Sequence, residues 1–274
     1  MATEETAPPG IDYTRPSIAR VYDFMLGGKN NFAIDREVAA MALKVTPDGP
    51  AAGEANRRFL RRVVHTMIAA GIDQILDLGS GLPTQGNVHE IAQAADPRVK
   101  VVYVDNDPMC LAHARALLAD SPNTTIIEGD VRDPDSILDD RKVREFIDFS
   151  RPVGLLMLAI LHHFHDDEDP GAIAGRFIDA LPPGSFVAIS HFHNPGDAMP
   201  DVAASALSVE KIFNEHLGTG RWRSHDEILA YFHGTVMLEP GIVPVAAWRP
   251  DLNDPQLLQP NTYYTFVGGL SRKP

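Results

Sequence analysis

The chain of 274 residues is 44% hydrophobic and 22% charged, enough apolar sequence to bury the core of one domain with an N-terminal extension. Its 24 Lys and Arg residues stand against 37 Asp and Glu residues, and a net charge of −13 repels the phosphates that dominate nucleic-acid binding. Nucleic acids and anionic membrane surfaces are therefore not expected as partners. The one cysteine, Cys110, excludes an internal disulfide and lies in a helical pattern, which predicts a small packed residue.

The N-terminus has neither the basic start nor the apolar middle of a signal peptide. The longest apolar stretch, residues 153–161, is shorter than the roughly 20 residues that cross a bilayer. We therefore expect a cytoplasmic protein without a membrane segment.

The first 70 residues are interpreted as a tail and a helical lid, and residues 71–274 as the main domain, the two forming one structural unit. Residues 1–10 are polar and end in Pro-Pro-Gly, which predicts a loosely attached tail. Helical spacing of apolar residues begins at Ser17 and stops at Gly27 and Gly28. Two more helices are predicted over 35–44 and 53–70, and the second carries a basic face formed by Arg57, Arg58, Arg61 and Arg62.

After Gly71, short apolar runs alternate with helical segments, a pattern typical of a parallel sheet covered on both faces. Strands are predicted over 74–78, 100–104, 125–127, 153–158 and 185–189. Helices are predicted over 88–94, 108–118, a region ending near 149, 172–180, 203–216 and 226–232, the last capped by Ser224. Two final apolar runs, 236–238 and 263–267, are joined by a loop too polar for a crossover helix, so an antiparallel pair is expected.

Glycines follow the first predicted strand at positions 79 and 81, where the chain turns into a helix. Without a Cβ, the backbone at such a turn can approach a ligand closely at the carboxyl end of the strand. A tight turn with no ligand is the alternative for this motif alone.

The second predicted strand ends in an acid, Asp105, which follows Gly81 by 24 residues. A carboxylate at this place can accept hydrogen bonds from both hydroxyls of a ribose. The competing role, capping the helix that starts at Pro108, is better filled by Asp107 directly before the proline.

After the third predicted strand comes the sequence Gly129-Asp130-Val131. The carboxylate of Asp130 can accept a hydrogen bond from the amino group of adenine while a neighbouring backbone N–H meets the ring. The alternative is that Asp130 only caps the next turn.

These motifs, in this order and followed by Leu-His-His-Phe after the fourth strand, resemble those of class I S-adenosylmethionine (SAM)-dependent methyltransferases over about residues 74–189. The resemblance implies an α/β, Rossmann-like fold with a seven-stranded, mostly parallel sheet, an antiparallel C-terminal hairpin and an N-terminal helical extension. It implies SAM as the cofactor. The one departure is Pro83, which is unusual at the entry to a helix and leaves the contacts of residues 82–87 open.

The same resemblance assigns parts of SAM to parts of the chain. The segment from Asp77 to Leu82 would meet the methionine portion, Asp105 the ribose, and Asp130 with Val131 the adenine. The implied cofactor residues of the main domain are Gly79, Ser80, Gly81, Asp105, Asn106, Gly129, Asp130, Val131 and Ala159.

The N-terminal segment 12–32 looks like the opening of an actinobacterial group of methyltransferases whose acceptors are largely unassigned. Its helix could cover the methionine end of SAM and exclude water from methyl transfer, with Tyr22 beside the sulfonium and Arg15 or Arg20 on the carboxylate. Met25 and Gly28 complete the contacts expected from this segment. The alternative is a packing helix with solvated charges.

Histidines follow the fourth and fifth strands at the edge of the sheet where ligands bind: His162, His163, His165, His191 and His193. We select His163 and His191 as candidate bases that take the acceptor's proton. Positioning alone could also suffice. No metal site is expected, because paired ligand spacing is absent.

The predicted reaction is transfer of the SAM methyl group to an oxygen or nitrogen of a small molecule, with release of S-adenosylhomocysteine. The acceptor pocket is expected around residues 191–194 and 199–220, with Trp222 as a wall. A non-catalytic SAM-binding sensor or partner subunit is the alternative. A nicotinamide dehydrogenase is less favoured, because its third glycine would fall on Thr84. The sequence leaves the acceptor and the oligomeric state open.

Overall fold

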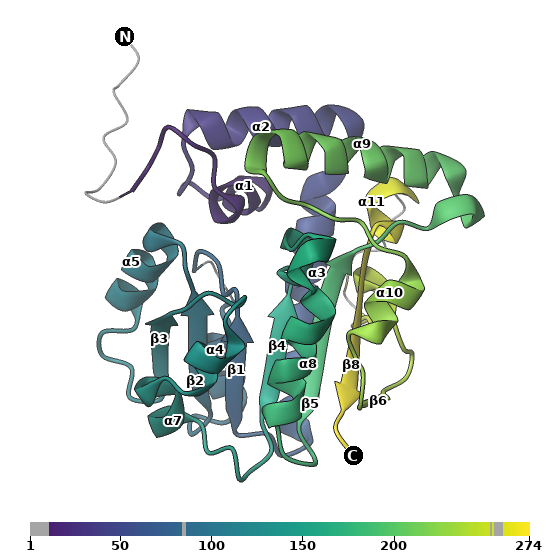
Figure 1. Ribbon diagram of the computed structural model, residues 1–274. Helices are drawn as coiled ribbons and strands as arrows, with labels where there is room; N and C mark the ends of the chain where they lie inside the picture. Colours follow the sequence, from purple (N-terminus) through teal and green to yellow (C-terminus); the bar gives the residue numbers. More distant parts are fainter. Residues whose placement is uncertain (1–10, 84–85, 253, 255–259) are drawn as a thin grey trace.

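The computed structural model describes residues 11–83, 86–252, 254 and 260–274. The predicted tail, residues 1–10, lies outside the described residues. Figure 1 shows a central sheet with helices on both sides. A further group of helices, α1 (Ile18–Met25), α2 (Ala33–Val45) and α9 (Pro200–Leu217), lies beyond one end of the strands.

Within the described residues, eight strands form one sheet in the order β3-β2-β1-β4-β5-β8-β6, and β7 pairs with β8 outside this path. Strands β1 to β5 are parallel to one another, and β8 is antiparallel to β5, β6 and β7. All five predicted parallel strands are confirmed, although β5 continues beyond its expected end. The bounds are β1 Gln74–Leu78, β2 Lys100–Asp105, β3 Thr124–Glu128, β4 Gly154–Leu158, β5 Phe186–Phe192, β6 Val236–Met237, β7 Val243–Pro244 and β8 Phe266–Arg272.

The antiparallel pairing expected at the C-terminus is confirmed, with Val236 of β6 opposite Arg272 of β8. Two details of the prediction are wrong. In the described part of the chain, the sheet has eight strands instead of seven, because the two-residue strand β7 also pairs with β8. The last strand starts at Phe266, because Tyr263 and Tyr264 end a short helix, α11 (Pro260–Tyr264).

The predicted helices are present, with altered ends. The helix predicted from position 53 begins at Gly49, and the helical region predicted to end near Phe149 consists of two short helices. The predicted caps are confirmed, because Asp107 accepts from two backbone N–H groups and Ser224 forms a capping box with Glu227. The remaining bounds are α3 Gly49–Ala69, α4 Val88–Ala95, α5 Pro108–Leu117, α6 Pro134–Leu138, α7 Arg141–Phe146, α8 Pro170–Ala180 and α10 His225–Ala230, with 3₁₀ turns η1 Leu161–His163, η2 Asp166–Glu168, η3 Gly196–Ala198 and η4 Val245–Ala247.

Two apolar cores lie on the two faces of the sheet. Residues of α3, α4 and α5 form one core with alternate strand residues such as Ile75 and Tyr103. Residues of α6, α7 and α8, together with Tyr231 and Phe232 after α10, form the other with the intervening strand residues, such as Leu76 and Val102. Because α3 belongs to a core, the name lid is kept below for α1 and α2 alone; α2 packs against both α1 and α9. The division at residue 70 stays a prediction.

The predicted basic face of α3 anchors the C-terminal part of the chain. Arg62 is buried, and its guanidinium donates to the carbonyl oxygens of Trp248 and Val245 at 2.7 Å each and pairs with Asp254. Its neighbour Arg61 is half exposed and pairs with Asp251 at 2.7 Å. The Arg62 contacts hold the Trp248 ring edge-on against Phe59 of α3, so they fix the segment that follows β7.

We expect Arg62→Ala to lower the free energy of unfolding by about 3 kcal/mol, because it removes the donors of two carbonyls and the shortest ion pair of Asp254. Arg61→Ala is the matched control and should cost less than about 1 kcal/mol, as expected for an exposed ion pair. Urea unfolding of both variants measures the difference. Equal losses would show that Arg62 acts only as a surface charge.

Candidate functional site

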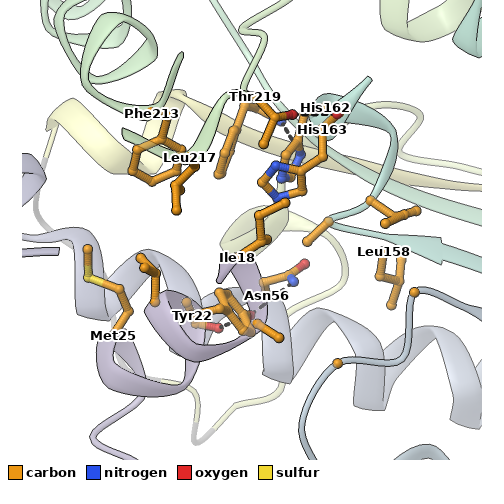
Figure 2. A pocket seen from close by; sticks show the side chains of 18 of the residues that line it. Ile18, Tyr22, Met25, Asn56, Leu158, His162, His163, Phe213, Leu217 and Thr219 are labelled. Atoms are coloured by element: carbon orange, nitrogen blue, oxygen red, sulfur yellow. Dashed lines mark hydrogen bonds between the residues drawn. The ribbon is translucent and has the colours of Figure 1, made fainter. Parts of the chain in front are cut away.

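The register of the parallel strands gathers the predicted motifs at one edge of the sheet. Leu78 pairs with Val104, and Val104 pairs with Ile127, so the turns after β1, β2 and β3 lie side by side. A cavity of about 550 Å³ opens at this edge. Figure 2 shows α1 residues on one side of it and His162 and His163 on the other. The predicted site residues that line it are Tyr22, Met25, Gly79, Ser80, Gly81, Asp105, Asn106, Gly129, Asp130, Val131, Ala159 and His163.

The turn after β1 needs glycine at both expected positions. Gly79 has a φ of +73°, and a Cβ there would lie 2.7 Å from Cδ1 of Ile160. Gly81 has a φ of +67° with open space around its Cα, so the backbone conformation is what favours glycine there. The N–H groups of Gly79 and Ser80 donate to the carbonyl of Val104, which ties this turn to β2. The backbone thus reaches the cavity without a side chain in the way.

Asp105, at the end of β2, is a buried carboxylate that lines the cavity. Its Oδ2 accepts from the N–H of Gly81 at 2.7 Å, and its Oδ1 accepts from the N–H of Asp107 at 2.9 Å. Burial raises the pKa of this carboxyl, and the backbone donors partly oppose that effect. Among the described residues, no cation pairs with it, so its remaining lone pairs suit hydroxyl donors of a ligand.

Asp107 links the lid to this turn. Its Oδ1 caps α5 by accepting from Met109 and Cys110, and its Oδ2 accepts from the hydroxyl of Ser17 at 2.7 Å. Ser17 directly precedes α1, and its N–H donates to Asp35 of α2 at 2.9 Å. The lid is therefore fastened two residues away from Asp105.

The turn after β3 lines the cavity with Gly129, Asp130 and Val131. A Cβ at Gly129 would lie 2.9 Å from Ile137, so packing demands a glycine there. Oδ1 of Asp130 accepts from the N–H of Arg132 at 2.9 Å, and Asp133 caps the following helix. Asp130 thus stabilises its own turn and also faces the cavity, so both roles considered for it stay open.

Ala159, after β4, has a φ of 57°, a conformation that non-glycine residues seldom adopt. Its N–H is held by the carbonyl and the hydroxyl oxygens of Ser190 on β5, at 3.1 and 3.0 Å. Strained backbone of this kind is concentrated at functional sites. The strain here lies on the wall of the cavity.

Asp77 lines the cavity from within β1, and burial raises its pKa to about 7. The nearby Arg57 opposes this shift, and the neighbouring charge of Asp105 adds to it. Two buried carboxylates therefore face the same cavity, which favours a ligand that carries positive charge.

Two polar cavity residues on α3, Asn56 and Arg57, were not predicted as site residues. The amide nitrogen of Asn56 donates to the hydroxyl of Tyr22 at 3.3 Å, whereas its buried Oδ1 has no partner among the described residues. Gly53, Asn56, Arg57 and Leu60 all line the cavity and follow the spacing of one helix face. A polar Asn on an otherwise packed helix face is the signal that could have indicated them.

The histidines at the edge differ in their surroundings. His163 lines the cavity, burial lowers its pKa to about 3, and its Nδ1 has no partner among the described residues. His162 stacks on Phe192 at 3.6 Å between ring centroids and accepts from the Phe192 N–H at 3.2 Å. Both rings are therefore neutral at physiological pH, and His163 offers an unused polar atom.

The sequence matches the S-adenosyl methyltransferase family over residues 4–274. The chain belongs to this family. A proposed methyltransferase from Thermobifida fusca YX is 42% identical, with a TM-score of 0.90 over 97% of this chain and 98% of the other. A DUF574 family protein from Streptomyces avermitilis MA-4680 is 36% identical, with a TM-score of 0.89 over 96% and 99%. Among curated proteins, none matches this chain.

The predicted class I methyltransferase fold, the enzymatic activity and the use of SAM are thus confirmed. Mitomycin 7-O-methyltransferase MmcR shares the fold alone, at 21% identity and a TM-score of 0.53 over 82% of this chain and 56% of that one. Neither the dehydrogenase nor the non-catalytic sensor is retained for a chain of this family. Among the described helices of the methyltransferase, none is long and apolar enough to span a membrane.

Two predicted cofactor residues lie outside the cavity of the methyltransferase. Arg20 is buried in an ion pair with Asp35 at 2.8 Å, so its guanidinium serves the lid instead of a ligand. At Gly28, a Cβ would lie 2.1 Å from Oδ1 of Asp23. This glycine allows Asp23 to accept hydrogen bonds within the α1–α2 connection.

His191, the second candidate base, also lies outside the cavity. It has no exposed surface, and its Nδ1 contacts the carbonyl of Phe192 while its Nε2 faces Arg223 at 3.3 Å. Burial lowers its pKa to about 3. The ring packs beneath the site and has no surface open to an acceptor.

The polar loop after β4 is held by ion pairs. Asp166 pairs with Arg221 at 2.6 Å and with the buried Arg223 at 2.8 Å. Arg223 also donates to the carbonyl of Phe164, which fixes the loop that carries His163. In the described parts of the chain, no group of three or more acidic, His or Cys side chains could hold a metal ion.

The raised pKa of Asp77 predicts a pH-dependent stability of the ligand-free enzyme. Between the ordinary pKa of 3.8 and about 7, the folded protein keeps a proton that the unfolded chain has lost. The free energy of unfolding should therefore fall as the pH rises through this window. Asp77→Asn has no carboxyl to titrate and should not lose this stability. The free energy of unfolding of the variant minus that of the wild type should therefore rise between pH 4 and pH 7, by on the order of 2 to 4 kcal/mol.

Urea unfolding of the two proteins across this pH range measures the effect. A stability difference that does not change with pH would contradict the protonated state of Asp77.

Proposed function

We propose that this enzyme transfers the methyl group of SAM to an oxygen or nitrogen of a small molecule, which binds in the same cavity as SAM. The observation that carries the proposal is the division of the cavity lining. Every charged residue among the described lining residues lies around β1 to β3 or on α3 next to them, namely Arg57, Asp77, Asp105, Asp107, Asp130 and Arg132. The remainder is lined by apolar or neutral residues of the lid, α9 and the loop after β4, and the guanidinium of Arg132 lies at its border, over the ring of Phe164.

The charged half fits SAM. The buried Asp105 has lone pairs for ribose hydroxyls, and the turn of Gly129 to Val131 would take the adenine. Asp77, Arg57 and the unpartnered oxygen of Asn56 offer opposite charges and an acceptor for the ammonium and carboxylate of the methionine portion. When bound, SAM supplies an electrophilic methyl group on its sulfonium. After the transfer, the remainder of the cofactor is released as S-adenosylhomocysteine.

The neutral half fits a small acceptor. Met25 of the lid and Phe213 and Leu217 of α9 line it with apolar surface, which suits a small molecule and would limit the access of water to it (Figure 2). The net charge of −13 also disfavours nucleic acids.

His163 stands on the wall of the cavity as a neutral ring. A pKa of about 3 makes it a weak base but a good hydrogen-bond acceptor, so it would orient the hydroxyl or amine of the acceptor. Arg223 and Asp166 would hold its loop in place. Methyl transfer would then depend mainly on positioning.

Incubation of the enzyme with SAM and a small-molecule library tests the proposal. We expect products that are heavier by one methylene unit and that appear only with active enzyme. Methylation of added protein or RNA, with none of the small molecules modified, would contradict it.

Asp105→Asn should weaken S-adenosylhomocysteine binding by roughly 10- to 100-fold, because a charged acceptor of two hydroxyls is replaced by an amide. Calorimetry measures the affinity. Glu128→Gln is the control and should bind as the wild type does, because this acid at the end of β3 is exposed and does not line the cavity. Unchanged binding to Asp105→Asn would place the ribose elsewhere.

A further inference from the structure

Three rings form a parallel stack at the neutral half of the cavity. His162 and Phe192 lie 3.6 Å apart between centroids with 15° between their planes, and Phe192 and Trp222 lie 4.2 Å apart with 13° between theirs. All three line the cavity. Phe192 occupies the middle of the stack, so Trp222 forms one end.

Trp222 is held in a fixed orientation. Its backbone N–H donates to Oε2 of Glu210 on α9 at 2.6 Å, and Glu210 also pairs with Arg221 at 3.0 Å. Among the described aromatic residues, Phe192 alone stacks on the indole face to face, and Phe213 meets it at 66°. The indole is only partly buried and lines the cavity, so part of the ring is open to a ligand.

The charges of the lining restrict what can lie beside this ring. The neutral half is built from side chains such as Met25, Leu60, Val209 and Phe266, and its described polar groups are uncharged. The guanidinium of Arg132, which lies at the border near His163, is already paired with Asp130 and Glu168. An acceptor with an ionised group would therefore be buried there without a free counterion, which is costly. A flat uncharged molecule instead gains apolar burial and offset stacking.

We propose that the acceptor is an uncharged, planar aromatic compound that stacks on Trp222 and presents its hydroxyl or amino group to His163. Trp222 is thus the residue that determines acceptor specificity. This inference rests on the proposed function, because it assumes that the neutral half of the cavity receives the acceptor.

The experiment uses 2-naphthol as the probe, with the fully saturated 2-decalol and the anionic 2-naphthoate as matched compounds. Binding to the enzyme saturated with S-adenosylhomocysteine is measured by calorimetry. We expect 2-naphthol to bind at least tenfold more tightly than either matched compound. Trp222→Leu keeps an apolar side chain but removes the ring, and should weaken 2-naphthol binding roughly threefold to tenfold.

Leu207→Ala is the control variant, because Leu207 lies on α9 with 52% of its surface exposed and does not line the cavity. It should bind 2-naphthol as the wild type does. The inference is overturned if 2-naphthol fails to bind, if 2-decalol or 2-naphthoate binds as tightly, or if Trp222→Leu binds 2-naphthol unchanged. Binding of S-adenosylhomocysteine to Trp222→Leu shows that its cofactor half is intact.

The two proposals can fail separately. Methylation of non-aromatic small molecules, without binding of 2-naphthol, would leave the proposed function standing and overturn the aromatic acceptor. Methylation confined to macromolecules would remove the proposed function itself.

Discussion

The hydrogen bonds of the Asp105 carboxylate organise this molecule. One oxygen binds the N–H of Gly81 after β1, and the other binds the N–H of Asp107 before α5. They join two neighbouring strand ends through a single buried anion that still faces the cavity. The two donors belong to residues with their own structural roles, because Gly81 has a positive φ and Asp107 caps α5. The cofactor half of the site depends on it most directly.

The same turn reaches the lid. Ser17 joins Asp107 to Asp35, and Asp35 in turn binds Arg20. The buried arginine therefore supports the cover over the cavity without touching what lies inside. On the other side, the carboxylate of Glu210 on α9 accepts from the backbone N–H of Trp222 and pairs with the side chain of Arg221. Charged residues outside the cavity thus position the neutral half, which itself carries no charge among the described residues.

The sequence was most informative where a short pattern determines the structure. The parallel strands, the glycine turn and the cap at Asp107 are local features with their own residue requirements, and each could be predicted. Arg20 was expected at the ligand, but it pairs with Asp35 instead. The sequence did not indicate this ion pair, because Asp35 lies in another helix. Asn56 and Arg57 were not predicted as site residues because only the packing of α3 brings them to the cavity. Tyr263 and Tyr264 favour a strand by composition, yet they lie in α11.

The central claim is that one cavity holds SAM in its charged half and the acceptor in its neutral half. A crystal structure of the complex with S-adenosylhomocysteine tests it most directly. The account predicts the ribose hydroxyls on Asp105 and the sulfur at the boundary of the two halves, open toward His163 and Trp222. Density for the ligand in the neutral half, or with its sulfur directed away from that half, would contradict the account.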